Sequence, residues 1–308
     1  NTLSGYELLQ LRLKMDESNG LPQVKANYGQ GDKLDASMTH ALQLMVTADI
    51  LEEVQNSPDQ MVSPCFPKLK PGRTFEDRPD LSLVRVLADL RSVNLKIISD
   101  DPDEWMHVNP TRNGATHSVP IGTCWYGDID LHDAFHHGRV HKSSRRYLVI
   151  YWKGKYYMYK GCPQGLKVAS GFFMMLMVDL LNQAVGGAWS NTTPSAGTQG
   201  MASPCSLPYS QPWWIGYCDD WMPIADTKVR CENRQRILRA ILEVMHLPLS
   251  PKCKGDAVSQ MGSLIGLNWT VNGHCLSDDA VESLMAALEL QPKTITDAKA
   301  IIGLINYS

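Results

Sequence analysis

The feature that most constrains this chain is a pair of adjacent carboxylates, Asp219 and Asp220, inside the apolar run from Trp213 to Met222. Two carboxylates a few ångströms apart repel each other where water is scarce, and one of them would normally take up a proton. Such a pair stays doubly charged only when a cation neutralises it. The run therefore predicts a divalent-metal site suited to phosphoryl chemistry.

Composition narrows the classes of protein that this chain can belong to. Its 308 residues suffice for two or three lobes, and its hydrophobic and charged fractions of 44% and 20% are those of a globular protein. The longest strongly apolar stretch, Phe172–Val178, is too short to span a membrane, so we expect no membrane partner. The 8 cysteines include no Cys-x-x-Cys pair, which disfavours a zinc site. Their scatter and the absence of a secretory segment favour an intracellular protein with reduced thiols.

The distribution of charge suggests a partner that the net charge of −3 does not. A negative total argues mildly against bulk electrostatic binding of nucleic acid. Between Asp133 and Asp179, however, the sequence has no acidic residue, and tyrosines and a tryptophan alternate there with basic residues. The basic residues are Arg139, Lys142, Arg145, Arg146, Lys153, Lys155, Lys160 and Lys167. This interval predicts a surface for phosphates and bases, and a solvated hairpin face is the alternative.

Apolar spacing and turn residues predict an α+β chain. We expect helices at 37–54, 169–185, 230–245 and 278–308. We expect strands at 64–72, 83–90 and 124–131. We expect hairpins at 146–159 around Lys153-Gly154, at 214–225 around the Asp pair, and at 261–276 around Asn272-Gly273, the last with a type I′ turn. Residues 1–34 are expected to be a loose lead-in, 114–122 a loop, and 186–212 a flexible insertion.

A metal site at Asp219 and Asp220 needs another carboxylate from a neighbouring strand. The candidate is the segment Asp128–His136, in which a buried strand ends in acidic residues. Taken alone, such residues also suit helix capping and solvated charge.

Several segments occur in the order found in retroviral-type reverse transcriptases. Asp130–Phe135 resembles their first catalytic motif, Pro163–Lys167 the next motif, and Tyr217–Asp220 the Tyr-x-Asp-Asp signature. Ser63-Pro64 and Lys70–Gly72 resemble the fingers strand, Arg85–Asn94 the Arg…Asp-Leu-Arg-x-x-Asn run, and Leu264–Gly266 the primer-grip hairpin. Residues 294–307 are similar to the segment after the thumb in gypsy-type long-terminal-repeat retrotransposons. The resemblance extends over about residues 37–308.

This resemblance implies a right-hand polymerase fold with fingers, a palm whose antiparallel sheet is backed by helices, and a partial thumb. The expected division is 1–36 as a lead-in, 37–123 as fingers and palm entry, 124–230 as palm with the inserted loop 186–212, 231–276 as palm end with the primer-grip hairpin, and 277–308 as the start of the thumb.

The resemblance also implies roles for single residues. The catalytic residues and metal ligands are expected to be Asp130, Asp219 and Asp220, with the carbonyl group of Leu131 as an extra ligand. Asp130 and Asp219 are expected to bridge two Mg²⁺ ions, for which Mn²⁺ would substitute.

Nucleotide binding is assigned to a second set of residues. Lys70 and Arg85 are expected to hold the triphosphate, together with the backbone amides of Asp133 and Ala134. Phe135 takes the position of the gate that excludes a ribose 2′-hydroxyl group, and Gln164 is expected to contact the incoming nucleotide and the template. The general acid is Lys252 or Lys254, between which the sequence does not decide. The primer grip comprises Leu264, Ile265 and Gly266.

The implied function is RNA-directed DNA polymerisation, in which dNTPs extend a primer on an RNA or DNA template by two-metal nucleotidyl transfer. No RNase H, protease or integrase sequence lies in the chain, so a separate RNase H or other protein subunit is an expected partner. The alternative is a domesticated reverse-transcriptase fold that acts as an RNA-binding or structural scaffold. A third hypothesis, an RNA-dependent RNA polymerase, is suggested by the spacing of Asp128 and Asp133 and opposed by Phe135 and Tyr217.

Overall fold

The structure is a computed structural model, and it describes residues 10–23, 27, 32–70, 84–98, 119, 122–173, 214–217, 219–250, 253, 257–264, 266–289, 294–295 and 297–298. The chain forms two compact units, and each unit is built from two separate stretches. The first unit comprises Asn1–Trp105 and Asp133–Leu176, and the second comprises Met106–His132 and Met177–Ser308. No helix within the described ranges combines the length and the apolarity that crossing a membrane requires.

A five-stranded sheet, in the order β1-β7-β6-β2-β3, forms the centre of the first unit. Its strands are β1 (Leu51–Val54), β2 (Val62–Leu69), β3 (Val84–Ala88), β6 (Val149–Trp152) and β7 (Lys155–Tyr159). The predicted hairpin at 146–159 is confirmed, because β6 and β7 pair in antiparallel fashion across Lys153 and Gly154. Both turn residues have positive φ, 45° and 84°, as the right-handed twist of a two-residue hairpin requires.

Helix α1 (Asp32–Thr47) packs against β1, β2 and β3. It buries Met38 and Leu42 completely. The predicted helix at 37–54 is therefore wrong at both ends, since residues 51–54 form β1 and pair with β7. The chain leaves the helix at Asp49, whose φ of 58° is left-handed, and left-handed residues commonly end helices. Ile50 and Val54, which fit a helical spacing, thus belong to the turn and the strand that follow.

The described part of the N-terminal stretch is held against the first unit, which corrects the expectation of a loose lead-in. Leu11 is buried and forms a β-bridge with Val140, and its amide donates a hydrogen bond of 2.8 Å to the Arg139 carbonyl group. Met15 forms a bridge with Ile97. Within the described residues this unit also contains three short helices, α2 (Arg91–Lys96), α4 (Ala134–His137) and α5 (Lys142–Arg145), and residues 169–173 are helical.

Four short strands form the main sheet of the second unit: β4 (Trp125–Tyr126), β5 (Ile129–Asp130), β8 (Trp214–Tyr217) and β9 (Asp220–Ala225). The predicted hairpin around the Asp pair is confirmed, because β8 and β9 pair directly. The predicted strand at 124–131 is interrupted at Gly127 and Asp128, although β4 and β5 follow one common register along β9. In that register Gly127 lies opposite Pro223, which has no N–H group to donate, so the ladder loses a hydrogen bond there.

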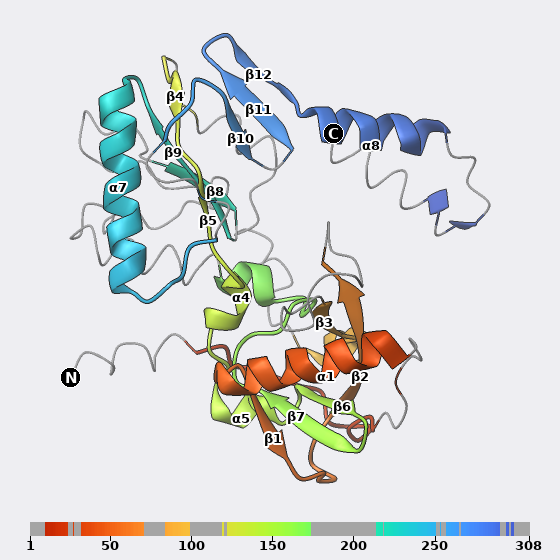
Figure 1. The fold of residues 1–308 in the computed structure, drawn as a ribbon. Coiled ribbons are helices and arrows are strands. Elements are labelled where there is room, and N and C mark those ends of the chain that lie inside the picture. The colour runs from red at the N-terminus through yellow and green to blue at the C-terminus, as the bar shows by residue number, and fades with distance from the viewer. Residues whose placement is uncertain are drawn as a thin grey trace. The chain divides into compact units, whose positions relative to one another are not determined.

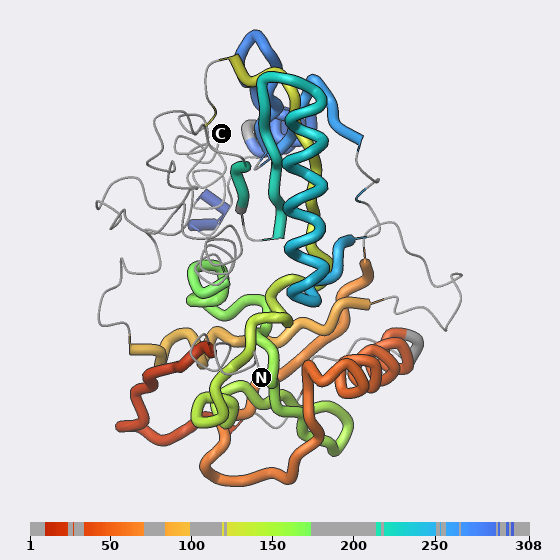
Figure 2. Tube along the Cα trace, turned by 90° about the vertical axis from the view of Figure 1, so that its left-hand side faces the viewer, coloured from red at the N-terminus to blue at the C-terminus, as the bar shows by residue number. Residues whose placement is uncertain are grey.

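Helix α7 (Lys228–Val244) contacts β9 and β4, and it runs alongside this sheet in both views (Figure 1, Figure 2). A second sheet comprises β10 (Gly262–Leu264), β11 (Leu267–Thr270) and β12 (Gly273–Leu276), and α8 (Asp278–Glu289) follows it. The predicted hairpin at 261–276 thus contains three strands. Its expected type I′ turn at Asn272-Gly273 is wrong, because Thr270 pairs with Gly273 and the turn residues Val271 and Asn272 lack positive φ.

Several predicted segments lie wholly or mostly outside the described residues. These are the loop at 114–122, the helix beyond residue 173, the insertion at 186–212 and the end of the helix predicted at 278–308.

The packing of the β8–β9 hairpin gives a stability prediction at Gly216. A Cβ atom there would lie 2.3 Å from a ring carbon of Trp221, whose ring centroid is 4.3 Å from that of Trp214. We expect Gly216→Ala to lower the free energy of unfolding by about 1–3 kcal/mol, because the buried rings must move. Denaturant unfolding measures this loss. Adding Trp221→Phe should make Gly216→Ala less costly, and an undiminished cost in the double variant would contradict the assigned contact.

Candidate active site

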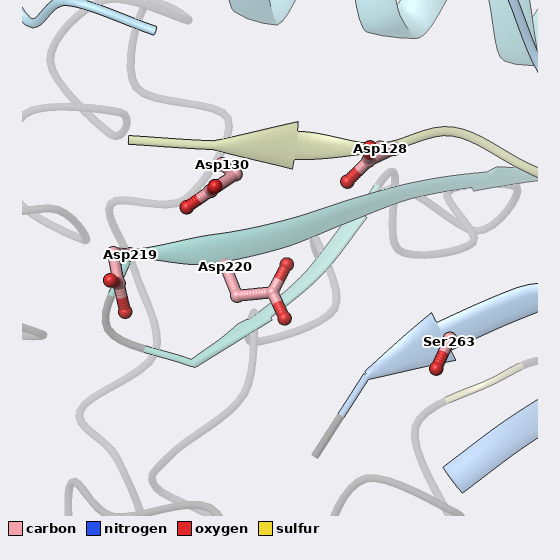
Figure 3. Close-up of a pocket in the computed structure, with 5 residues that line it drawn as sticks. All are labelled: Asp128, Asp130, Asp219, Asp220 and Ser263. Carbon is pink, nitrogen blue, oxygen red and sulfur yellow. The ribbon is translucent and has the colours of Figure 1, made fainter. Parts of the chain in front are cut away.

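The candidate segment that begins at Asp128 meets the Asp pair because β5 pairs with β9. Side chains alternate between the two faces of a strand, so Asp128 and Asp130 project from the same face. Asp130 lies opposite Asp220 in the β5–β9 pairing, and Asp219 immediately precedes β9 in the turn after β8. Asp128, Asp130, Asp219 and Asp220, with Ser263 of β10, line one cavity of about 350 Å³ (Figure 3). The prediction that Asp130 lies near the Asp pair therefore agrees with the structure.

Backbone hydrogen bonds fix the positions from which these carboxylates project. The Leu131 amide donates to the Asp219 carbonyl group at 2.9 Å, which ties the β8–β9 turn to the end of β5. The Ser250 amide donates to the Asp130 carbonyl group at 2.7 Å. The Asp130 amide donates to Sγ of Cys253 at 2.8 Å. These bonds hold together the backbone positions from which Asp130 and Asp219 project.

Burial and electrostatic repulsion raise the pKa values of two carboxyl groups at this cavity, Asp220 and Asp128. Burial, followed by the charges of Asp128, Asp130 and Asp219, raises the pKa of Asp220 to about 7. Partial burial and the charge of Asp130 also raise the pKa of Asp128, and the Arg239 guanidinium opposes that shift. A divalent cation would relieve this repulsion, and carboxylate oxygens are the ligands that Mg²⁺ and Mn²⁺ prefer. The donor set therefore fits such an ion.

The carboxylate side chains that line the cavity are not oriented toward a common point. Among the described residues, no three His, Cys, Asp or Glu side chains stand together in the geometry of a metal site. In Figure 3 the Asp220 side chain points away from those of Asp130 and Asp219. Side-chain rotation of these residues toward a common ion would be needed.

The predicted nucleotide-binding residues all belong to the first unit. Lys70 directly follows β2, and Arg85 is exposed on β3, where it pairs with Lys68. Gln164 is half-buried in the loop before Gly165. Asp133 has a left-handed φ of 51° at the N-terminal end of α4, and Ala134 behind it is buried. The described structure thus places Lys70 and Arg85 on or beside two paired strands and the other residues at α4 and in a turn, and their role in nucleotide binding stays a prediction.

The predicted gate residue, Phe135, is half-buried and packs against another aromatic ring. Its ring centroid lies 5.6 Å from that of Phe173, which is itself buried, and the two rings are tilted by 58°. This contact restricts the Phe135 ring to a narrow range of positions.

The other predicted site residues have mixed outcomes. Leu131 is buried, and its role as a carbonyl ligand stays a prediction. Leu264 ends β10, and Gly266 follows with a positive φ of 66° in the turn to β11. Ile265, Lys252 and Lys254 lie outside the described residues.

Five of the eight basic residues in the interval 139–167 form ion pairs with four acidic residues from earlier in the chain. The ion pairs are Arg139–Asp49, Arg146–Glu17, Lys153–Asp35, Lys155–Glu53 and Lys160–Asp49. Lys167 donates to the Ile97 carbonyl group at 3.1 Å. These pairs favour the alternative of a solvated face over a phosphate-binding surface, because the interval's positive field is offset locally.

Sequence analysis did not assign Asp128 and Ser263 to the cavity. For Asp128 the signal was present, because a residue two positions before Asp130 on a strand must share its face. For Ser263 it was absent, since only tertiary packing brings β10 beside β9.

Comparison with known proteins identifies the family. Residues 68–262 match the family model described as "Reverse transcriptase (RNA-dependent DNA polymerase)". The match covers more than half of the chain, so the chain belongs to the reverse transcriptase family. Among curated proteins, none matches the sequence.

Solved structures show the same fold. Two structures of a foamy viral protease–reverse transcriptase with double-stranded DNA, one of a form designated dRH, each have a TM-score of 0.63 at 18% identity over 99% of this chain. A third, with an RNA/DNA hybrid, has a TM-score of 0.62 at 18% identity over 99% of this chain. This chain spans 48%, 57% and 36% of those chains, in that order. The predicted right-hand polymerase fold, with its antiparallel sheet, is confirmed.

The raised pKa of Asp220 predicts a pH-dependent change in stability. The unfolded carboxyl group ionises near pH 4, whereas the folded one keeps its proton up to about pH 7. The stability of the metal-free protein should therefore fall as pH rises through this window. We expect Asp220→Asn to stabilise the metal-free protein by on the order of 1–3 kcal/mol at pH 8, with little effect at pH 4, because Asn cannot ionise.

Thermal unfolding with a chelator present, at both pH values, measures this difference. The exposed Glu243 of α7 provides the control, since Glu243→Gln removes the same charge away from the cavity. An equal effect of Asp220→Asn at pH 4 and pH 8 would show that the pKa of Asp220 is not raised in the folded protein.

Proposed function

We propose that this chain is an RNA-directed DNA polymerase, a nucleotidyltransferase that extends a primer with dNTPs on an RNA or DNA template. The observation that carries the proposal is the convergence of Asp130 with Asp219 and Asp220 on one cavity, in a chain of the reverse transcriptase family. Complexes of the foamy viral protein with double-stranded DNA and with an RNA/DNA hybrid support a primer–template partner.

In this proposal Asp130, Asp219 and Asp220 hold two Mg²⁺ ions, or Mn²⁺ in their place, and the Leu131 carbonyl group is an additional ligand. Bound ions of this kind stabilise the attacking and leaving oxygens of an in-line displacement. The chain's own contribution is position, because the Leu131–Asp219 and Ser250–Asp130 backbone bonds fix the backbone that carries Asp130 and Asp219. Positioning and electrostatics, rather than covalent catalysis, then lower the barrier.

The remaining roles belong to the proposal as well. Lys70 and Arg85 bind the triphosphate with the amides of Asp133 and Ala134, and Gln164 contacts the nucleotide and the template. The Leu264–Gly266 turn contacts the primer. The general acid is Lys252 or Lys254. The adjacency of β2 and β3 supports the paired role of Lys70 and Arg85.

The wider assignments rest on sequence resemblance. They are membership of the gypsy-type long-terminal-repeat group, the division into fingers, palm and thumb, an intracellular location, and a separate RNase H or other protein subunit. The scaffold alternative draws support from the ion-paired interval at 139–167, which leaves less positive charge for a template. The gathered carboxylates oppose it, because a scaffold gains nothing from their repulsion.

Primer extension tests the proposed activity directly. With an RNA template, a DNA primer, dNTPs and Mg²⁺, the wild-type chain should extend the primer. Asp130→Asn and Asp219→Asn should each lower the rate at least about a hundredfold, since metal ions contribute several kcal/mol to such reactions. The matched control is Asp226→Asn, because Asp226 follows the far end of β9 and pairs with Arg230.

The outcomes separate the two hypotheses. Extension that survives Asp219→Asn would contradict the carboxylate assignment. Absence of extension by the wild-type chain, with primer–template binding intact in an anisotropy titration, would favour the scaffold.

The packing of Phe135 against Phe173 gives a prediction for sugar selectivity. We expect Phe135→Val to raise the use of ribonucleotides relative to deoxynucleotides by about tenfold or more, because the flat ring no longer occupies the space of the 2′-hydroxyl group. The ratio of kcat/KM for dCTP and CTP measures this change and corrects for any general loss of activity. An unchanged ratio would remove Phe135 from the gating role.

A further inference from the structure

The β4–β5 segment carries Asp128 and Asp130 and is called the catalytic strand below. On the edge that faces away from β9, its backbone groups have hydrogen-bond partners at each position from Tyr126 to Asp130 that faces that way. Odd-numbered residues of the β4–β5 segment bond to β9, so the backbone groups of Tyr126, Asp128 and Asp130 face the opposite side. Tyr126 exchanges two hydrogen bonds of 2.8 Å with Ser259. Asp130 is bonded to Ser250 and Cys253. For Asp128, which lies at the interruption of the strand, side chains of α7 provide the partners.

Gln235 of α7 is the main partner of Asp128. Its side chain is fully buried, and Oε1 accepts a hydrogen bond of 2.9 Å from the Asp128 amide. Nε2 of the same carboxamide donates to the Ala257 carbonyl group at 3.4 Å. Arg239, one helical turn further, places Nη2 3.5 Å from the Asp128 carbonyl oxygen. One buried carboxamide thus connects the catalytic strand to the segment that leads into β10.

The fit around Gln235 is tight on the side of the strand. A Cβ atom on Gly127 would lie 1.9 Å from Oε1 of Gln235 and 3.1 Å from Cγ of Pro223. The Gly127 amide donates to the Pro223 carbonyl group at 2.7 Å. Glycine at position 127 therefore leaves room for the Gln235 carboxamide next to the point where Pro223 has no N–H group to donate.

A buried glutamine is unusual at the apolar interface between a helix and a sheet, because its desolvation must be compensated by hydrogen bonds. An apolar residue of similar size would fill the space but leave the Asp128 amide and the Ala257 carbonyl group without these partners. Gln235 is not among the predicted site residues, and it is not one of the residues that line the cavity. Its bond to the strand is instead with the amide of Asp128, in the peptide group that joins Gly127 to Asp128.

We propose that Gln235 is a positioning residue of the catalytic strand: it holds the Asp128 peptide at the strand interruption and so directs Asp128 and Asp130 into the cavity. The role of Gln235 in catalysis rests on the proposed function. The hydrogen-bonded link between α7 and the strand that carries Asp128 and Asp130 does not depend on whether the chain is an active polymerase.

Amide-resolved hydrogen exchange on the metal-free full chain tests the link. Gln235→Met keeps the side-chain volume and removes both hydrogen bonds. We expect the Asp128 amide to exchange about tenfold faster in this variant, which corresponds to the loss of one typical hydrogen bond. The control is Leu242→Ala, a buried change on the same helix, which should destabilise the fold without selectively freeing Asp128.

Calorimetric titration with Mn²⁺ alone supplies the second readout. We expect Gln235→Met to weaken Mn²⁺ binding about three- to tenfold, because Asp128 and Asp130 are less well oriented, and Leu242→Ala to leave it unchanged. Selective exchange at Asp128 together with weaker Mn²⁺ binding supports the proposal. Unchanged exchange at Asp128, equal effects of the two variants, or unchanged Mn²⁺ affinity each overturns it.

Gly127→Ala tests the same contact from the strand side if Gln235→Met does not fold. The new methyl group should displace the carboxamide and weaken Mn²⁺ binding similarly. In the Gln235→Ala background, Gly127→Ala should have little further effect, and an undiminished effect there would overturn the proposal. Failure of primer extension by the wild-type chain would refute the polymerase assignment and leave the result on Gln235 standing.

Discussion

Repulsion among carboxylates at the edge of an apolar sheet is the constraint on which the second unit depends. Asp128, Asp130 and Asp220 project from one face, and the rest of that face is apolar, with Tyr126, Met222 and Ile224 buried against β10 and β11. Burial, together with this repulsion, raises the pKa of Asp220 to about 7, and a bound divalent cation would offset the repulsion. The fold maintains this arrangement because backbone groups on both edges of the β4–β5 segment are bonded, and the apolar packing resists separation of the strands.

Pro223 of β9 weakens the sheet next to the carboxylates. In a central strand proline removes a ladder bond, and here the loss falls opposite Gly127, next to the carboxylates that line the cavity. The chain compensates from outside the sheet, because Gln235 and Arg239 of α7 reach backbone groups of Asp128. In addition, Ser259 bonds to Tyr126, Ser250 and Cys253 bond to Asp130, and Leu249 forms a β-bridge with Leu131. The β4–β5 segment, which carries Asp128 and Asp130, is thereby held by α7 and by single residues that precede β10, as well as by its neighbour β9.

Local signals predicted much of the fold. Lys153-Gly154 predicted a hairpin turn correctly because positive φ at both positions is a local preference, and the apolar residues around Asp219 and Asp220 predicted their strands. The sequence failed where a tertiary contact or a single backbone conformation decides. Asp49 ends α1 by a left-handed φ, Val271 and Asn272 form the turn expected at Gly273, and Pro223 interrupts a strand that is distant in sequence. The acid-free interval after Asp133 suggested a basic surface, but Glu17, Asp35, Asp49 and Glu53 meet it only in the folded chain. Gln235 could not be predicted from the sequence either, because its partners Asp128 and Ala257 meet it only in the folded chain.

The central claim is that Asp130, Asp219 and Asp220 bind a shared divalent cation. Anomalous diffraction from crystals of the wild-type chain soaked in Mn²⁺ tests it most directly, because the signal locates the ion without reference to activity. The account predicts an anomalous peak within the cavity, within bonding distance of an Asp130 oxygen and of an oxygen from the Asp pair. A fully soaked crystal with no peak there, or with Mn²⁺ bound only elsewhere, would contradict it.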